Sequence, residues 1–269
     1  MNIKELVHQA PAWSSGEDDM RGIVLSSRVR LARNLSGCPF ALKASEQDRG
    51  AVTDQVLEAA RNCPALGQVM YLSVDALDEE DRRLLVERRL ISPALADGKG
   101  RRGVLFDGEE TLSVMVNEED HLRIQAILPG LNAARAWTRV NAVDDELGKL
   151  LEYAYSARWG FHTSCPTNVG TGLRVSVLMH LPALVLAEDM ERVVRGLGQM
   201  SFAVRGLYGE GTNSSGNLFQ VSNQATLGRA EDEIVDDLLK IVRKLVEYEK
   251  EAQETLVAEA RPQVTDKIW

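Results

Sequence analysis

Three strand-like runs follow one another between residues 103 and 128, and their spacing restricts the fold more than any other feature. The runs 103–106, 111–116 and 121–128 are rich in aliphatic and β-branched residues, and Pro129-Gly130 ends the last of them. The connections between them are too short for the helical crossover that joins parallel strands. The sequence therefore predicts antiparallel hairpins in which each strand pairs with its neighbour along the chain.

Helical periodicity flanks these strands. Ser45 followed by acidic residues is typical of a helix start, and Ile234, Leu238 and Leu245 recur on one face of a long C-terminal helix. Further strands are predicted over residues 22–32, 69–74, 201–205 and 217–222, and helices over 3–8, 45–62, 78–90, 132–158, 188–199 and 231–259. This mixture favours the α+β class, an antiparallel sheet flanked by helices.

Composition excludes several classes of protein. The 269 residues carry a formal net charge of −9, which disfavours nonspecific binding to nucleic acid. There is no apolar run of the ~18 residues that cross a bilayer and no signal peptide, so we expect no membrane contact and a cytoplasmic location. Three cysteines and four histidines are scattered, which predicts neither a disulfide framework nor a protein-held metal site.

Ser26-Ser27-Arg28-Val29-Arg30 lies in the strand predicted over residues 22–32. The two-residue period of a strand places Arg28 and Arg30 on one face. Two adjacent guanidinium groups repel each other unless an anion lies between them. The alternative is a solvated sheet face, but the flanking residues are apolar, and this favours an anion site.

The acidic run Asn-Glu-Glu-Asp-His-Leu-Arg at residues 117–123 joins two of the predicted strands. Alternation would place Glu119, His121 and Arg123 on one face. Asp120 and Leu122 would lie on the other. The alternative is an exposed acidic turn with a surface ion pair, which contributes little to stability.

Two glycine-rich segments complete the set of candidate sites. Residues 165–174 combine Cys165 with glycines whose backbone N–H groups can turn toward an anion at a helix start, although the segment lacks the Gly-Lys-Ser/Thr of a Walker loop. Residues 205–211 bring Arg205 and Glu210 to the end of a strand. The alternatives are a buried, inert thiol and a turn with incidental charges.

The four segments match one family in order and spacing. Residues 165–171 (Cys-Pro-Thr-Asn-Val-Gly-Thr) resemble the signature of the phosphagen, or guanidino, kinases, and 117–123 and 205–210 resemble its companion motifs. The bacterial protein-arginine kinase branch of this ATP:guanido phosphotransferase family is the closer match. It shares Val-Leu-Ser-Ser-Arg-x-Arg-Leu-Ala-Arg-Asn at 24–34, Leu-Ile-Ser-Pro at 90–93 and Met-His-Leu-Pro-Ala-Leu-Val-Leu at 179–186. The resemblance covers residues 13–260, approximately.

The resemblance implies a phosphagen-kinase catalytic domain that uses ATP, with Mg²⁺ held mostly by phosphates and water. Two glutamates would grip the acceptor guanidinium beside a cysteine, while arginines surround the phosphates. The implied catalytic residues are Glu119, Glu210, Cys165, Arg123, Arg174 and Arg205. The implied nucleotide-binding residues are Ser26, Ser27, Arg28, Val29, Arg30, Arg123, Arg174, Val175, Ser176, Val177, Leu178, Arg205, Gly206, Leu207, Tyr208, Gly209 and Glu210.

Departures from the family refine these expectations. Residues 1–269 read as a single catalytic domain, with a short helical lead (1–20), a long last helix (231–260) and no C-terminal regulatory domain. The small-molecule kinases carry a helical domain ahead of the first arginine strand, and its absence favours protein substrates with exposed arginine. Arg89 replaces a histidine of the related enzymes, so that role is not carried over.

The resemblance also implies a stress response that involves an activator protein and Clp-type protease machinery. Two alternatives remain open at this point. One is a kinase of free L-arginine or another small guanidino compound. The other is a non-catalytic module that binds nucleotide or phosphoarginine.

Overall fold

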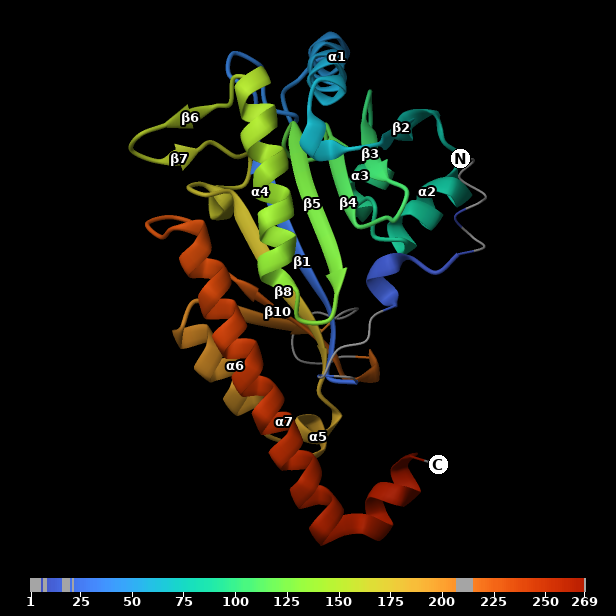
Figure 1. The fold of residues 1–269 in the computed structure, drawn as a ribbon, viewed down its shortest axis with the longest axis vertical. Coiled ribbons are helices and arrows are strands. Elements are labelled where there is room, and N and C mark those ends of the chain that lie inside the picture. Colours follow the sequence, from blue (N-terminus) through green and yellow to red (C-terminus); the bar gives the residue numbers. More distant parts are fainter. Residues whose placement is uncertain (1–5, 7–8, 16–19, 21, 207–214, 269) are drawn as a thin grey trace.

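An eight-stranded antiparallel sheet organises the molecule (Figure 1), in the order β2–β3–β4–β5–β1–β8–β10–β9. The computed structural model describes residues 6, 9–15, 20, 22–206 and 215–268, with only the backbone of residues 215 and 259–268. The strands are β1 (Val24–Arg33), β2 (Val69–Ser73), β3 (Gly103–Asp107), β4 (Leu112–Val116), β5 (Leu122–Pro129), β8 (Leu173–His180), β9 (Phe202–Gly206) and β10 (Leu218–Asn223).

The predicted hairpins are confirmed. β3 pairs with β4 and β4 with β5, both antiparallel, as the short connections require. The two central strands, β1 and β8, also pair antiparallel, although about 140 residues separate them along the chain. The sheet with its flanking helices confirms the α+β class.

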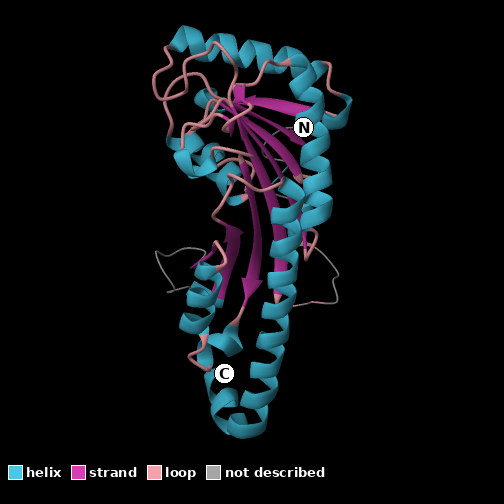
Figure 2. Ribbon diagram, turned by 90° about the vertical axis from the view of Figure 1, so that its left-hand side faces the viewer, coloured by secondary structure: helices cyan, strands magenta, loops and turns pink. Residues whose placement is uncertain are grey.

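Helices cover one face of the sheet, and the main core lies between the two layers (Figure 2). Val29 and Leu31 of β1 and Val175 of β8 are fully buried there. The sheet-covering helices are α4 (Ala133–Leu150), which contacts β1 and β5, α6 (Met190–Gln199), which contacts β9, and α7 (Glu231–Ile268), which contacts β8 and β10, while α1 (Glu46–Arg61) packs on α4 and α5 (Pro182–Leu186) on α7.

A second, smaller core lies on the opposite face. There α2 (Glu79–Glu87) and α3 (Pro93–Asp97) pack against Val104 and Phe106 of β3 and Met115 of β4. Arg123 of β5 pairs with Met115 across the sheet, so its side chain lies on this same face. No residue of β1 belongs to this second core.

Several element boundaries differ from the predictions. The helix predicted over residues 132–158 ends at Leu150, because Leu151 adopts an extended conformation and the chain forms a small hairpin, β6 (Tyr155–Ser156) and β7 (Gly160–Phe161). The helix predicted to reach residue 90 ends at Glu87, and Arg89 has a positive φ of 61°. The helix predicted over 3–8 lies largely outside the described residues.

No helix in the described part of the chain combines the length and the apolar character needed to cross a membrane.

Candidate active site

A cavity of about 240 Å³ opens on the sheet face that carries the arginines, and it collects six of the predicted catalytic and nucleotide-binding side chains. Four are guanidinium groups and the others are a carboxylate and a thiol. The predicted residues that line it are Arg30, Arg123, Arg174, Arg205, Glu119 and Cys165, joined by Ala32, Thr167, Asn168, Gly172, Gln220 and Ser222.

The register of five adjacent strands builds this cavity. Arg30 of β1 lies directly opposite Arg174 of β8, and Ala32, two residues further along β1, lies opposite Arg123 of β5. On the other side, Gln220 of β10 lies opposite Arg205 of β9. Directly paired residues of antiparallel strands point to the same face, so β5, β1, β8, β10 and β9 each supply at least one side chain.

Arg28 lies next to the cavity without lining it. Its Nη2 donates to Oε1 of Gln220 at 3.2 Å, which connects β1 to the cavity wall across β8. Burial lowers the pKa of Arg28 to about 10, and the nearby positive charges of Arg89, Arg123 and Arg174 act in the same direction. Arg28 therefore belongs to the same cluster of cations.

Among the described residues, the positively charged side chains of the cluster outnumber the carboxylates beside them, Glu118 and Glu119. Burial, followed by repulsion from Arg28, Arg123 and Arg174, holds the pKa of Arg30 well below its usual range, and burial and Arg205 lower that of Arg174. The Nε of Arg30 is buried without a hydrogen-bond partner among the described residues. A compact polyanion such as a nucleotide phosphate chain would satisfy these donors and offset the repulsion.

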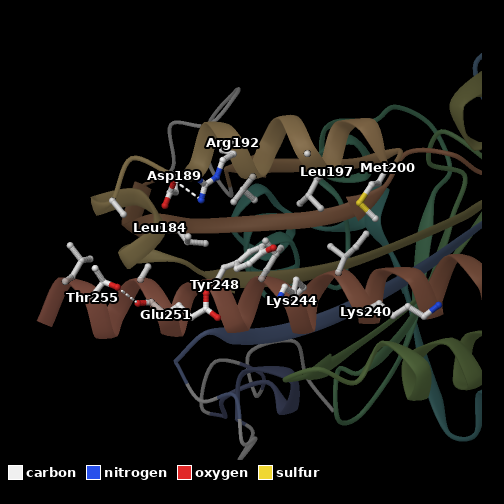
Figure 3. Close-up of a pocket in the computed structure, with 17 residues that line it drawn as sticks. Leu184, Asp189, Arg192, Leu197, Met200, Lys240, Lys244, Tyr248, Glu251 and Thr255 are labelled. Atoms are coloured by element: carbon white, nitrogen blue, oxygen red, sulfur yellow. Dashed lines mark hydrogen bonds and ion pairs between the residues drawn. The ribbon is translucent and has the colours of Figure 1, made fainter. Parts of the chain in front are cut away.

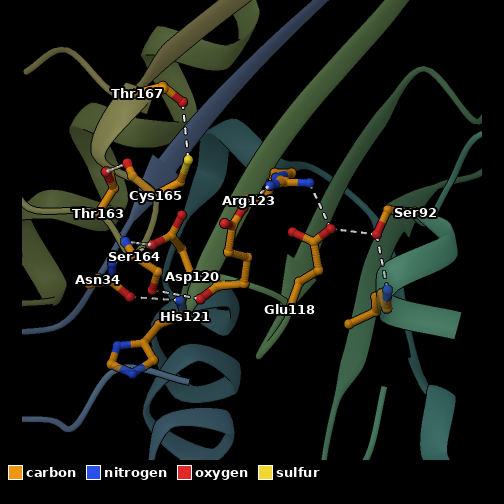
Figure 4. Close-up of polar contacts among 12 residues, drawn as sticks. Asn34, Ser92, Glu118, Asp120, His121, Arg123, Thr163, Ser164, Cys165 and Thr167 are labelled. Atoms are coloured by element: carbon orange, nitrogen blue, oxygen red, sulfur yellow. Dashed lines mark hydrogen bonds and ion pairs between the residues drawn. The ribbon is translucent and has the colours of Figure 1, made fainter. Parts of the chain in front are cut away.

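Two carboxylates pair with Arg123, and Figure 4 shows the one of Glu118. Nη1 of Arg123 lies 2.7 Å from Oε1 of Glu118, and its Nη2 lies 3.4 Å from Oε2 of Glu119. Burial raises the pKa of Glu119, and the negative charges of Asp120 and Glu118 add to the increase, while Arg123 opposes it. A raised pKa makes the Glu119 carboxylate a better proton acceptor at the edge of the arginine cluster.

Hydrogen bonds from Asn34 and Ser164 hold the loop that carries Glu119. Oδ1 of Asp120 accepts hydrogen bonds of 2.6 Å from Nδ2 of Asn34 and from the backbone N–H of Ser164. The hydroxyl of Ser164 donates to the backbone oxygen of Glu119 at 2.7 Å. Because Ser164 directly precedes Cys165, these bonds hold the carboxylate and the thiol at a defined separation.

The prediction that His121 shares a face with Glu119 and Arg123 is wrong. Asn117 has a positive φ of 58°, and residues 117–121 form a tight turn, so strand alternation begins only at Leu122. His121 is fully buried instead, where Nδ1 accepts from the N–H of Leu35 at 3.0 Å and Nε2 lies 2.9 Å from the Pro39 oxygen.

The glycine-rich segment leads into strand β8 rather than into a helix, and two of its N–H groups bond within the protein instead of facing the cavity. The N–H groups of Gly170 and Thr171 donate to Phe161 and Thr226 oxygens. A Cβ at Gly170 would lie 2.3 Å from the Thr226 oxygen, so this glycine allows a close backbone approach. Cys165 is the first residue of this segment, and its Sγ lies 3.0 Å from Oγ1 of Thr167.

The remaining predicted residues fall into three groups. Val29, Val175 and Val177 lie in the main core, with side chains on the other face of the sheet. Others lie on the strands that bear the arginines without lining the cavity: Ser26, Ser27, Ser176, Leu178 and Gly206. The third group lies outside the described residues: Leu207, Tyr208, Gly209 and Glu210.

Sequence reasoning missed Glu118 and Gln220. Adjacent acids in a turn give no signal for which one reaches an arginine, so Glu118 was not separated from Glu119. Gln220 was visible only as part of a strand, and its role depends on a partner, Arg28, that is 192 residues away.

A larger cavity, of about 910 Å³, lies elsewhere, between α5, α6 and α7 (Figure 3). Its wall combines apolar side chains such as Leu197, Met200 and Tyr248 with charged groups including Arg192 and Lys244. It contains none of the predicted site residues. The smaller cavity, with its converging charges, is therefore the candidate active site.

Comparison with known proteins assigns the family. The chain is 42% identical over 269 residues to the protein-arginine kinase of Halothermothrix orenii and 44% identical over 273 residues to that of Pelotomaculum thermopropionicum. Each alignment covers the whole of this chain and 77% of the relative.

Solved structures agree with these relatives. The duplicated taurocyamine kinase from Schistosoma mansoni with bound transition-state analog components superposes with a TM-score of 0.79 at 28% identity, over 95% of this chain and 36% of that one. Lombricine kinase gives 0.76 at 26% identity, over 89% and 69%. Residues 51–252 match the sequence profile of the ATP:guanido phosphotransferase C-terminal catalytic domain, and the chain therefore belongs to this family of phosphagen kinases.

Proposed function

We propose that this protein is a protein-arginine kinase, which transfers the γ-phosphoryl group of ATP to the guanidinium group of arginine residues in proteins. The observation that carries the proposal is the single cavity in which four arginines, Glu119 and Cys165 meet. The eight-stranded sheet, whose strands run from Val24 to Asn223, supports the proposal that residues 1–269 form one catalytic domain.

The acceptor guanidinium must lose a proton, and this explains why the carboxylate of Glu119 lies in the cavity. An arginine side chain has a pKa above 12, so only on the order of one guanidinium in a million is neutral at pH 7. Glu119 orients the guanidinium and accepts its proton as the N–P bond forms. Glu210 is proposed as the second carboxylate of this clamp, and Cys165 as a thiol that helps to fix the cationic acceptor.

The arginines are proposed to bind ATP, the phosphoryl donor. Phosphoryl transfer requires in-line alignment and neutralisation of the negative charge that spreads over the phosphate oxygens. Arg28, Arg30, Arg174 and Arg205 are proposed to hold the phosphate chain, and Arg123, beside Glu119, to contact the phosphoryl group in transit. Strands β1, β8 and β9, with the predicted nucleotide-binding residues, would line the rest of the nucleotide.

Mg²⁺ is proposed to accompany ATP. In the described part of the chain, no group of three or more histidine, cysteine or carboxylate side chains is placed to hold a metal ion. Mg²⁺ commonly keeps phosphate oxygens and water as its main ligands, so we propose that it enters the site bound to ATP. The bound ion would neutralise phosphate charge.

Sequence identity favours protein substrates over small guanidino compounds, because the chain is more similar to protein-arginine kinases than to kinases of small molecules. The relatives named protein-arginine kinase share 40–44% identity with the chain, whereas taurocyamine kinase and lombricine kinase share 26–28%. A cytoplasmic location, a role in stress, an activator protein and Clp-type protease machinery are proposals that rest on the family resemblance alone.

The decisive experiment offers the protein ATP and Mg²⁺ with either casein or free L-arginine. We expect phosphoarginine on the protein substrate, detected by mass spectrometry under conditions that preserve the acid-labile N–P bond. Replacement of Glu119 by Gln should abolish transfer while nucleotide binding remains. Product from the free amino acid alone would favour the small-substrate alternative, and nucleotide binding without any product would favour the non-catalytic one.

A further inference from the structure

The two carboxylates that contact Arg123 are not equivalent. The Glu118 pair is short, at 2.7 Å, and the Glu118 side chain is only 3% exposed. The Glu119 pair is long, at 3.4 Å, and the Glu119 side chain is 40% exposed. A solvated, stretched ion pair is weak and easily exchanged, whereas a buried pair is held strongly once formed.

Glu118 is itself fixed by a rigid element. Its Oε1 accepts a hydrogen bond from the hydroxyl of Ser92 (Figure 4). The same hydroxyl accepts from the backbone N–H of Leu95 at 3.0 Å and so caps α3. Because Leu95 is fully buried in the second core, Glu118 is held by a well-packed part of the fold.

The two carboxylate oxygens of Glu118 differ in their contacts. Oε2 is buried without a hydrogen-bond partner among the described residues, as is the Nε of Arg30. Leaving a buried carboxylate oxygen unpaired is costly unless cations surround it. Glu118 faces such cations, since its charge also acts on Arg30.

We propose that Glu118 is a positioning residue of the transfer reaction: it retains Arg123 at the edge of the arginine cluster, so that Glu119 is free to release Arg123 and bind the acceptor guanidinium. The inference rests on the proposed function, because it presupposes an acceptor at Glu119. Without the negative charge of Glu118, the carboxylate among the described residues that still pairs with Arg123 is that of Glu119. Arg123 would then occupy the acceptor's place and leave its position beside the phosphoryl group.

The test compares Glu118→Gln with Glu249→Gln. Glu249 is a fully buried carboxylate that accepts two backbone hydrogen bonds from α5, remote from the cavity, and so controls for the loss of any buried charge. We expect Glu118→Gln to raise the KM for the protein substrate and to lower kcat/KM by about 100-fold, the scale of a small misplacement of a reacting group. Affinity for ADP, which lacks the transferred phosphoryl group, should stay within about threefold of wild type.

The pH profile separates positioning from general instability. In Glu118→Gln, Arg123 should close on Glu119 and stabilise its charge, so the acid limb of the kcat/KM profile should move to lower pH. Ser92→Ala should also raise the KM for the protein substrate and lower kcat/KM, but by less than Glu118→Gln does. Glu249→Gln should lower the melting temperature and leave both the KM and the pH profile unchanged.

The outcomes are distinct. Transfer by Glu118→Gln within about threefold of wild type overturns the inference. Loss of ADP binding together with a lower melting temperature also overturns it, because Glu118 would then support the fold in general. If wild type itself forms no phosphoarginine, the proposed function fails instead.

Discussion

At the scale of single residues, the arginine cluster is a compromise between binding and stability. Arg28, Arg30 and Arg174 all have lowered pKa values because they are buried beside like charges. Sites that hold like charges together are a common source of instability in free enzymes, and removing one charge relieves it.

Replacing Arg174 by Gln should therefore have opposite effects on the free and the bound protein. The melting temperature without nucleotide should stay the same or rise, while ATP affinity should fall about 10- to 100-fold, which corresponds to about 1.5–3 kcal/mol for one charge-assisted hydrogen bond. Thermal unfolding and an ATP titration measure the two effects. A lower melting temperature with unchanged ATP affinity would contradict the assignment of Arg174 to the phosphates.

His121 makes stability depend on pH. Burial lowers the pKa of its imidazole, so the folded protein holds it neutral, with the proton on Nε2 facing the Pro39 oxygen. The unfolded chain protonates this group near pH 6.5. The contribution of His121 is thus complete above about pH 6.5 and is lost as pH falls from there toward the lower folded-state pKa.

The His121→Asn variant should remove this dependence. Its unfolding free energy in urea should be lower than that of wild type at pH 7.5, and the difference between the two proteins should shrink at pH 5.5. Parallel curves for both proteins across this range would show that His121 does not titrate on unfolding.

The sequence predicted single residues where alternation is regular and missed them where it is interrupted. Arg28 and Arg30 share the predicted face because β1 is regular between Ser26 and Leu31. The turn at Asn117 breaks the period, and this is why His121 was misplaced and Glu118 overlooked. The acceptor clamp stays a prediction, because Glu210 lies outside the described residues.

At the scale of elements, a buried glutamate joins two helices. The carboxylate of Glu249 on α7 accepts from the N–H groups of Ala183 and Leu184 at 2.9 and 3.0 Å, which are unpaired donors at the start of α5. Gln253, one turn later, donates to the same carboxylate at 3.0 Å.

Replacing Glu249 by Ala should reduce the free energy of unfolding by about 3 kcal/mol, because two buried N–H groups lose a charged acceptor. Kinase activity at 25 °C should be retained, since this junction lies away from the cavity. Urea denaturation monitored by circular dichroism gives the stability. A variant as stable as wild type would show that water replaces the carboxylate.

Elements were predictable where local signals mark their ends. The capping box between Ser45 and Asp48 starts α1 at the predicted place. The end of α4 carries no such signal, and tertiary contacts decide it: the chain leaves the helix so that Tyr153 can pair with Leu35 of the segment after β1. A long-range contact of this kind leaves no local trace in the sequence.

At the scale of the whole molecule, the anion that binds the cluster should stabilise the sheet, because the arginines proposed to bind it come from four strands, β5, β1, β8 and β9. Nucleotide at about 100 times its dissociation constant adds about 2.7 kcal/mol to the free energy of unfolding. For a chain of this size we expect the melting temperature to rise by on the order of 5–10 °C.

The control is a nucleotide with a shorter phosphate chain. At equal concentration, AMP should give a smaller increase in melting temperature than ATP, since it offers the arginines fewer phosphate oxygens. Equal shifts for both nucleotides would indicate that the base or ribose, and not the phosphate chain, provides most of the stabilisation.

The strand order also has a consequence for how the protein is made. β1 is synthesised early, yet one of its two neighbours, β8, begins only at Leu173, and the strand carrying Arg205 comes later still. During translation, the first arginines emerge long before the strands that complete their site. The nascent polypeptide therefore cannot hold a phosphate chain as the finished enzyme does, and phosphorylating activity becomes a late marker of correct assembly.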